Sequence, residues 1–214
     1  MDKVRLVVFD LDGTLIDAYP AIIASLNYTM DALGYPKRSE RAIKRAVGWG
    51  DRNLLRPFVR PKDVDAALAV YRRHHAASLI EKSRLYPQVK RLLRLLHRKG
   101  ILLAVATNRP ARFSHILLRH LGIKAFFDAI VCGDTVTHRK PHPQILRVIM
   151  RRLHVEPRET VFVGDMHIDV QTGNRAHVFT VALTSGSSSR GELRRERPGC
   201  ILDAVWDVRR FVSA

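Results

Sequence analysis

The fold is decided by residues 4–14, which read VRLVVFDLDGT. Val4–Phe9 is an almost continuous apolar run, of the kind found in strands that are covered on both faces. Asp10 and Asp12 follow it directly, and Gly13 permits a tight turn that points backbone amides at an anion. Two carboxylates this close repel each other unless a cation or a proton relieves them. The stretch therefore predicts a buried strand with a charged reaction site at its carboxyl end.

Further strand-like runs alternate with helical patterns along the rest of the chain. Pro87–Lys99 and Ala111–Leu121 have apolar residues at helical spacing and stop at glycines, and Ser189 with Glu192 has the spacing of a capping box. This alternation predicts an α/β fold, a Rossmann-like parallel sheet with helices on both faces. The other expected strands are Ile101–Ala106, Ala129–Cys132, Thr160–Val163 and Val178–Ala182.

One long region interrupts the alternation. From Ile16 to Leu85 no convincing strand is found, and two helical faces stand out, one around Ile22 and Leu26 and one around Leu68 and His75. The region is longer than an ordinary connection between two strands. We therefore expect a core domain of residues 1–16 and 86–214 and an inserted helical cap domain of residues 17–85, with hinges near 16–20 and 86–87.

Composition limits the class of protein. The 214 residues are 46% apolar and 27% charged, as in folded globular domains. No apolar run approaches the ~18 residues that span a membrane, and the first run lacks the features of a signal peptide. Two cysteines, Cys132 and Cys200, cannot build a disulfide framework. We expect a cytoplasmic protein without a membrane segment, either a monomer or a homodimer.

The charge is unusual, because 37 Lys and Arg residues face 20 Asp and Glu residues, giving a formal net charge of +17. Such a field attracts anionic substrates and polyanions. The basic residues are spread along the chain rather than gathered in one arm, and aromatic residues make up only 7%. This distribution argues against specific recognition of nucleic acid, which commonly uses aromatic side chains as stacking platforms.

Polar residues follow several of the expected strands. Thr107-Asn108 follows the second strand, Lys140-Pro141 comes after the third, and Gly164-Asp165 ends the fourth, with Asp169 four residues later. Ligands of open α/β sheets bind beyond the carboxyl ends of the strands. The sequence therefore predicts that these side chains meet Asp10 at one edge of the sheet.

The order DxDGT, threonine, lysine and GDxxxD resembles the haloacid dehalogenase superfamily over nearly the whole chain. The helical insertion is similar to the cap of its phosphoglycolate phosphatase-like subfamily, and Leu85–Pro87 resembles the hinge that returns to the core. The resemblance implies that Asp10 is a nucleophile that forms an aspartyl phosphate and that Asp12 is a general acid and base. It further implies that Thr107, Asn108 and Lys140 bind the phosphoryl group.

The resemblance also implies a Mg²⁺ ion. Asp10 and Asp165 would hold it with the backbone carbonyl of Asp12, and Asp169 would support the site. Magnesium prefers oxygen ligands, so this set suits it.

Residues 48–52, Gly-Trp-Gly-Asp-Arg, resemble the cap loop that reaches the active site in this subfamily. Arg52 would then bind a carboxylate or a second phosphate of the substrate. The alternative is an ordinary turn, with Trp49 packed inside the cap and Arg52 in solvent.

The function that these residues favour is Mg²⁺-dependent hydrolysis of a small phosphomonoester, a phosphoglycolate-like metabolite being the best candidate. A sugar phosphomutase of the same fold is one alternative. A basic protein that binds nucleic acid or an acidic partner without catalysis is another, but such a protein has no need of the paired Asp10 and Asp12.

Overall fold

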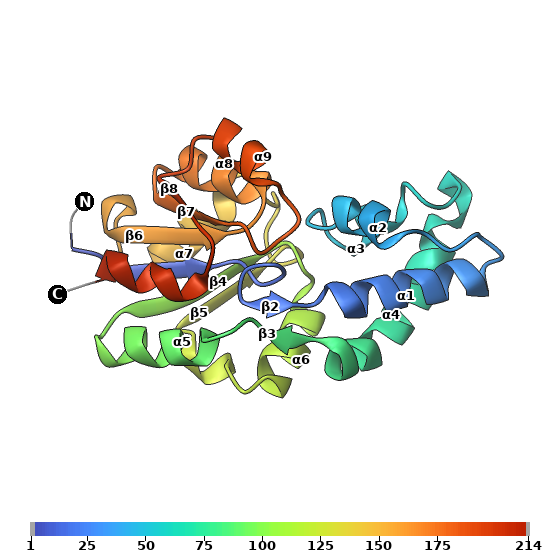
Figure 1. The fold of residues 1–214 in the computed structure, drawn as a ribbon, viewed down its shortest axis with the longest axis horizontal. Coiled ribbons are helices and arrows are strands. Elements are labelled where there is room, and N and C mark those ends of the chain that lie inside the picture. The colour runs from blue at the N-terminus through green and yellow to red at the C-terminus, as the bar shows by residue number, and fades with distance from the viewer. Residues whose placement is uncertain (1–2, 213–214) are drawn as a thin grey trace.

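A six-stranded parallel sheet forms the core of the computed structural model, which describes residues 3–212 (Figure 1). The strand order β5-β4-β1-β6-β7-β8 and the all-parallel pairing confirm the predicted fold class. The first two and last two residues of the predicted core domain lie outside the described residues. The strands are β1 (Leu6–Phe9), β4 (Leu102–Thr107), β5 (Ala129–Cys132), β6 (Thr160–Gly164), β7 (Phe179–Leu183) and β8 (Cys200–Leu202).

The first strand lies at the centre of the sheet. Leu6 is paired with Leu102 of β4 on one side and with Thr160 of β6 on the other. All four residues of β1 are fully buried, which explains its unbroken apolar sequence. Asp10 therefore emerges from the middle of the sheet, flanked by the ends of β4 and β6.

Helices cover both faces of this sheet, as expected (Figure 1). Val7 and Phe9 of β1 point into the apolar cluster that includes α5 and α6, whereas Leu6 and Val8 point into the cluster that includes α7. On the first face lie α5 (Val89–Arg98), α6 (Ala111–His120) and the 3₁₀ segment Val205–Val212; on the second lie α7 (Gln144–Leu153), α8 (His167–Ala176) and α9 (Arg190–Arg195). Two further 3₁₀ turns, Lys124–Phe126 and Pro157–Glu159, connect elements of the core.

The helical insertion lies beyond one end of the sheet, on the right in Figure 1. Its long helices α1 and α4 pack together through the apolar faces predicted around Leu26 and Leu68. The insertion contains α1 (Tyr19–Ala32), α2 (Glu40–Ala46), α3 (Asp51–Leu55), the 3₁₀ turn Pro61–Asp63 and α4 (Val64–Lys82).

Two short strands join the insertion to the core, in a region where the sequence predicted none. β2 (Ile16–Asp17) and β3 (Arg84–Leu85) form an antiparallel ribbon, and the Tyr86 amide donates to the Leu15 carbonyl at 3.0 Å. Strands of two residues are too short to show an alternating pattern, which is why the sequence did not reveal them. The ribbon coincides with the predicted hinges, and the exact domain boundaries at 16/17 and 85/86 stay a prediction.

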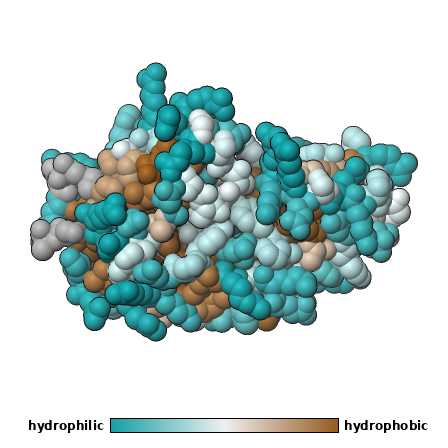
Figure 2. Space-filling model, viewed as in Figure 1, coloured by the Kyte–Doolittle hydropathy of each residue, from teal (hydrophilic) through white to brown (hydrophobic). Residues whose placement is uncertain are grey.

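Most of the face drawn in Figure 2 is hydrophilic, and apolar residues occur there in small separate areas. Within residues 3–212, the large apolar side chains that are exposed are Tyr28, Trp49 and Ile80. Among the described residues, no helix is both long enough and apolar enough to cross a membrane.

The close packing of α8 on β7 depends on Gly173. A Cβ atom at this position would lie 1.8 Å from the hydroxyl oxygen of Thr180, which is itself buried. We expect Gly173→Ala to lower the free energy of unfolding by about 1–2 kcal/mol, because overpacking outweighs the gain in helix propensity. Denaturant unfolding measures the change.

Gly191→Ala in α9 is the matched control, since nothing lies within 4 Å of a Cβ atom there. It should raise the free energy of unfolding by up to about 1 kcal/mol. Equal stability of the two variants would contradict the packing account.

Candidate active site

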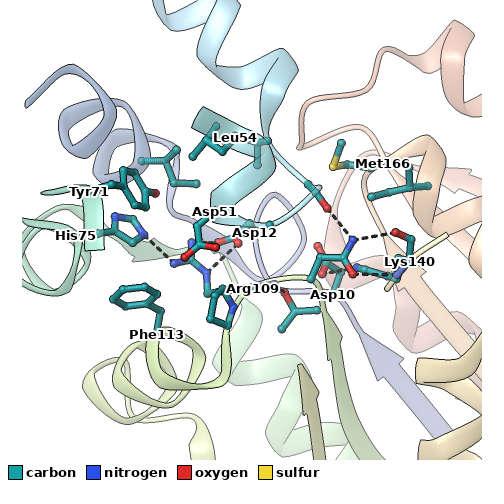
Figure 3. Close-up of a pocket in the computed structure, with 18 residues that line it drawn as sticks. Asp10, Asp12, Asp51, Leu54, Tyr71, His75, Arg109, Phe113, Lys140 and Met166 are labelled. Atoms are coloured by element: carbon teal, nitrogen blue, oxygen red, sulfur yellow. Dashed lines mark hydrogen bonds and ion pairs between the residues drawn. The ribbon is translucent and has the colours of Figure 1, made fainter. Parts of the chain in front are cut away.

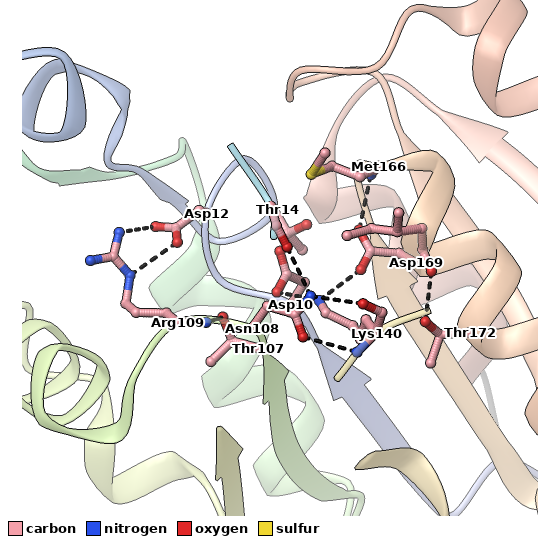
Figure 4. Close-up of polar contacts among 12 residues, drawn as sticks. Asp10, Asp12, Thr14, Thr107, Asn108, Arg109, Lys140, Met166, Asp169 and Thr172 are labelled. Carbon is pink, nitrogen blue, oxygen red and sulfur yellow. Dashed lines mark hydrogen bonds and ion pairs between the residues drawn. The ribbon is translucent and has the colours of Figure 1, made fainter. Parts of the chain in front are cut away.

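The polar residues predicted to meet at the carboxyl edge of the sheet do meet there (Figure 4). Asp10 follows β1, Thr107 ends β4, and Asp165 follows β6. These side chains are buried although they are polar, as are Lys140 and Asp169. Buried polar groups need partners, so their mutual contacts determine the geometry of the site.

Lys140 lies between two of the carboxylates. Its Nζ is 2.6 Å from Oδ1 of Asp10 and 2.7 Å from Oδ1 of Asp169. Burial alone would lower the pKa of Lys140, but the two carboxylates outweigh it and the pKa is raised. The lysine is therefore a fixed cation within the site.

The position of Lys140 is set by Asn108 at the end of β4. The Asn108 amide nitrogen donates to the Lys140 carbonyl at 3.0 Å, and its amide oxygen accepts from the Lys140 backbone amide at 3.0 Å. The Asn108 amide nitrogen also donates to the Gly48 carbonyl at 2.8 Å. One side chain thus joins β4, the lysine loop and the cap loop.

Asp10, Asp165 and Asp169 form a carboxylate cluster whose potential ligand atoms all lie within 4.8 Å of one another. Burial, the largest cause, raises the pKa of Asp10 to about 7, although Lys140 opposes the shift. Burial and the neighbouring carboxylates also raise the pKa of Asp165 well above its usual value. A cation bound here would relieve the repulsion, and the oxygen-only donor set fits a divalent metal such as Mg²⁺.

Contacts from the protein hold the cluster oxygens in place. The Thr14 hydroxyl and the Ser187 amide donate to Asp165 at 2.9 and 3.2 Å, and the Met166 amide donates to Asp169 at 2.9 Å. Gly13 has a φ of +88°, and a Cβ atom there would lie 2.4 Å from Oδ2 of Asp165. The turn after β1 therefore needs glycine both for its backbone conformation and for this close approach.

Asp12 projects away from this cluster, although it is two residues from Asp10. Its two carboxylate oxygens accept from Nε and Nη2 of Arg109 at 3.0 and 2.7 Å (Figure 4). The sequence prediction placed Asp12 at the metal through its backbone carbonyl alone, and that role stays a prediction.

A cavity of about 60 Å³ opens in front of these groups, with room for only a few water molecules (Figure 3). The core lines one side with Asp10, Thr107 and Lys140. The cap lines the other side, partly with apolar side chains such as Ile22 and Leu54. The cap thus forms one wall of the cavity, which suits a small ligand.

The predicted cap loop reaches this cavity, but Arg52 does not line it. Gly48, Gly50 and Asp51 are among the lining residues, whereas the Arg52 guanidinium forms an ion pair with Asp65 on the cap surface. The structure therefore does not bring Arg52 to the site, and its predicted contact with substrate stays without structural support. Trp49 is 38% exposed rather than packed inside the cap.

Four charged or titratable residues of the cavity were not predicted as site residues: Arg109, His75, Tyr71 and Asp51. Arg109 follows Thr107-Asn108 directly, so its position next to the strand end was an available signal. His75 belongs to the helical face that the sequence predicts around Leu68, and no site role was predicted for it. It is a cap residue, and it is buried against Tyr71 and Phe113.

Comparison with known proteins identifies the class of protein to which this site belongs. Residues 7–183 match the family model of haloacid dehalogenase-like hydrolases. A phosphoglycolate phosphatase of Pseudomonas putida is 36% identical over 93% of this chain and 76% of its own length. A phosphoglycolate phosphatase of Vibrio cholerae is 30% identical over 96% of this chain and 95% of its own.

A solved structure is similar over its full length. The crystal structure of a predicted phosphoglycolate phosphatase from Haemophilus somnus has a TM-score of 0.93 and 26% identity, covering all of both chains. Fold, carboxylate cluster and relatives together define a phosphatase of the α/β class with a helical cap. The chain belongs to the haloacid dehalogenase-like hydrolase family.

The ion pairs of Lys140 stabilise the buried carboxylates, so we expect Lys140→Met to be costly. In metal-free protein the loss should be about 3–5 kcal/mol of unfolding free energy, because buried carboxylates lose their cation. The folded-state pKa of Asp10 is already above its unfolded value, and the substitution raises it further. A group of this kind favours folding at low pH and loses that contribution as pH rises, so the loss should be larger at pH 8 than at pH 5.

Lys44→Met is the control, because the Lys44 side chain is 45% exposed and its two charge contacts are weak: an ion pair with Glu40 at 4.0 Å and a position over the Tyr19 ring. It should change the unfolding free energy by less than about 0.5 kcal/mol. Denaturant unfolding in EDTA at both pH values measures the two variants. A Lys140→Met protein as stable as Lys44→Met at pH 8 would show that the cluster does not depend on the lysine.

Proposed function

We propose that this phosphatase hydrolyses a small phosphomonoester in a Mg²⁺-dependent reaction, through an aspartyl phosphate on Asp10. The observation that carries the proposal is the position of the Asp10 carboxylate. It lies at the end of the central strand, is held by Lys140, and borders both the buried carboxylate cluster and the cap-covered cavity.

The reaction divides into two displacements at phosphorus. In the first, a carboxylate oxygen of Asp10 forms a bond to phosphorus, the ester P–O bond breaks, and Asp12 gives its proton to the leaving oxygen. In the second, Asp12 takes a proton from water as the water oxygen attacks phosphorus and the bond to Asp10 breaks. Each group thus returns to its starting state after one turnover.

Fixed charges and donors stabilise the transferring phosphoryl group. Lys140 and Asn108 are held rigidly at the cavity, and the Thr107 hydroxyl accepts from the Arg109 amide at 3.2 Å, which orients its own proton. Preorganised donors of this kind are usually the largest catalytic contribution. Mg²⁺, held by Asp10, Asp165 and the Asp12 carbonyl with support from Asp169, would neutralise charge on the phosphoryl oxygens.

A phosphoglycolate-like metabolite is the best candidate substrate. The cavity is small and bordered on one side by the cap, which favours a compact leaving group over a polymer. Relatives that share 30–36% of their residues with this chain are named phosphoglycolate phosphatases. We place the enzyme in the cytoplasm, where small phosphorylated metabolites occur.

The metal site predicts a stability change that does not require turnover. Addition of Mg²⁺ at about 100 times its dissociation constant should raise the unfolding free energy by ~2.7 kcal/mol. Asp165→Asn should abolish this increase, because the buried cluster loses a charged ligand, while Asp203→Asn at an exposed position should keep it. An increase that persists in Asp165→Asn would place the metal elsewhere.

Turnover tests the nucleophile. Phosphate release from a panel of phosphomonoesters should require Mg²⁺, stop in EDTA, and be fastest for two- and three-carbon phosphorylated acids. Asp10→Asn should lower kcat by at least about 10³-fold, because an amide cannot form the acyl phosphate, while the Asp17→Asn control should stay near the native rate.

No phosphate release from any panel member would contradict the phosphatase proposal. A metal-dependent exchange of phosphate between two positions of a sugar, without release to water, would support a phosphomutase instead. Native rates in Asp10→Asn would remove Asp10 from the mechanism.

A further inference from the structure

Arg109 binds both carboxylate oxygens of Asp12, the proposed general acid. Nη2 of Arg109 is 2.7 Å from Oδ1 of Asp12 and Nε is 3.0 Å from Oδ2, and the arginine is only 7% exposed. Paired contacts between a guanidinium and a carboxylate are among the strongest hydrogen bonds in proteins. The Asp12 side chain is thereby fixed on the cap side of the cavity (Figure 3).

The cap holds the remaining guanidinium nitrogen of Arg109, Nη1. Nη1 of Arg109 donates to Nε2 of His75 at 2.9 Å, since a guanidinium can only donate. Burial and the adjacent Arg109 hold the pKa of His75 well below its usual value, so the ring is neutral and its Nδ1 carries the proton. Nδ1 donates to the Ser25 hydroxyl at 3.0 Å, which donates to the Ala21 carbonyl at 2.8 Å.

This arrangement keeps Asp12 away from its proposed role in catalysis. A general acid must present a proton to the leaving oxygen, but both Asp12 oxygens are turned toward Arg109. If Asp12 simply turned away, a buried guanidinium would be left without its counter-charge among Tyr71 and Phe113, which is strongly unfavourable. Another anion has to replace Asp12 for the acid to become available.

We propose that Arg109 exchanges Asp12 for a carboxylate of the substrate and so releases Asp12 to act as general acid. This inference rests on the proposed phosphatase function and assigns Arg109 as the group that recognises the substrate carboxylate. Arg109 then determines specificity by contact with the substrate, and it positions Asp12 when no substrate is bound.

The phosphoryl-binding and carboxylate-binding groups of this proposal line the same small cavity. Thr107, on the phosphoryl side, and Arg109 are separated by one residue, which places their Cα atoms at most ~7 Å apart. The cavity that joins them has about 60 Å³. The small cavity that holds both groups favours a short chain between the phosphate ester and the carboxylate, of about one or two carbon atoms.

The test compares 2-phosphoglycolate with its neutral isostere, 2-phosphoglycolamide, on the native enzyme and on Arg109→Gln. The native enzyme should favour the carboxylate by about 10²-fold in kcat/KM, because the amide does not displace Asp12. Much of this difference should appear in kcat rather than in KM, since the amide binds without freeing the acid.

Arg109→Gln should lose about 10²-fold in kcat/KM on phosphoglycolate. Its kcat on the amide should equal or exceed the native value, because glutamine no longer holds both Asp12 oxygens. A purely structural role would slow both substrates together, and a role in binding alone would leave the native kcat equal for the two substrates. Either result overturns the exchange.

Two further variants keep the test decisive if Arg109→Gln folds poorly. Arg109→Lys keeps a cation but cannot engage both Asp12 oxygens with fixed geometry, so about 10-fold of the preference for phosphoglycolate should remain. Arg112→Gln removes the same charge from an exposed position three residues later, in α6, and should keep the native ratio. If Arg112→Gln lost the native ratio of kcat/KM for the carboxylate and the amide substrates, net charge, and not Arg109, would select the substrate.

The result also separates this inference from the proposed function. Native enzyme that hydrolyses both substrates at equal rates in Mg²⁺ remains a phosphatase, and the role of Arg109 is then wrong. Native enzyme that hydrolyses neither substrate, nor any other phosphomonoester, overturns the proposed function and the exchange together.

Discussion

The site depends on one lysine ammonium group held among buried carboxylates. Lys140 contacts Asp10 and Asp169 directly, and Asp165 completes the negative cluster. Without a cation these charges could not be buried together, and the pKa of Asp10 is already raised to about 7 by its burial. The parallel sheet brings the groups together because its strands all end at the same edge. The fold therefore positions the carboxylates, and Lys140 allows them to be buried close together. Their combined negative charge favours a divalent metal at this site.

The cap does more than cover the cavity, because it contributes polar contacts on which core residues depend. Asn108 donates to the Gly48 carbonyl of the cap loop, and Arg109 donates to His75 of α4. These two core residues are neighbours at the end of β4. Movement of the cap relative to the core, to which the β2–β3 ribbon joins it, would break both contacts at once. Opening of the cavity and release of Arg109 are thus coupled through the same short segment of chain.

Sequence reasoning located the sheet, the cap and the groups that meet at the sheet edge, because buried parallel strands and their polar ends leave long, local patterns. It missed what depends on distant partners. Arg52 forms an ion pair with Asp65. This pairing depends on how the cap helices pack, and no local sequence pattern indicates it. The position of Arg109 beside a strand end was a signal, but its burial was not predictable, because it involves a contact with His75, which is 34 positions away. The ribbon strands escaped detection because two residues show no periodicity.

The central claim is that Asp10 carries the phosphoryl group during turnover. The most direct measurement is an acid quench of a single turnover with phosphoglycolate and Mg²⁺, followed by peptide mass mapping. The account predicts one phosphoryl group on the Asp10 side chain, formed before phosphate is released and discharged at a rate consistent with kcat. Release of phosphate without any phosphorylated peptide, or with the group on another residue, would contradict it.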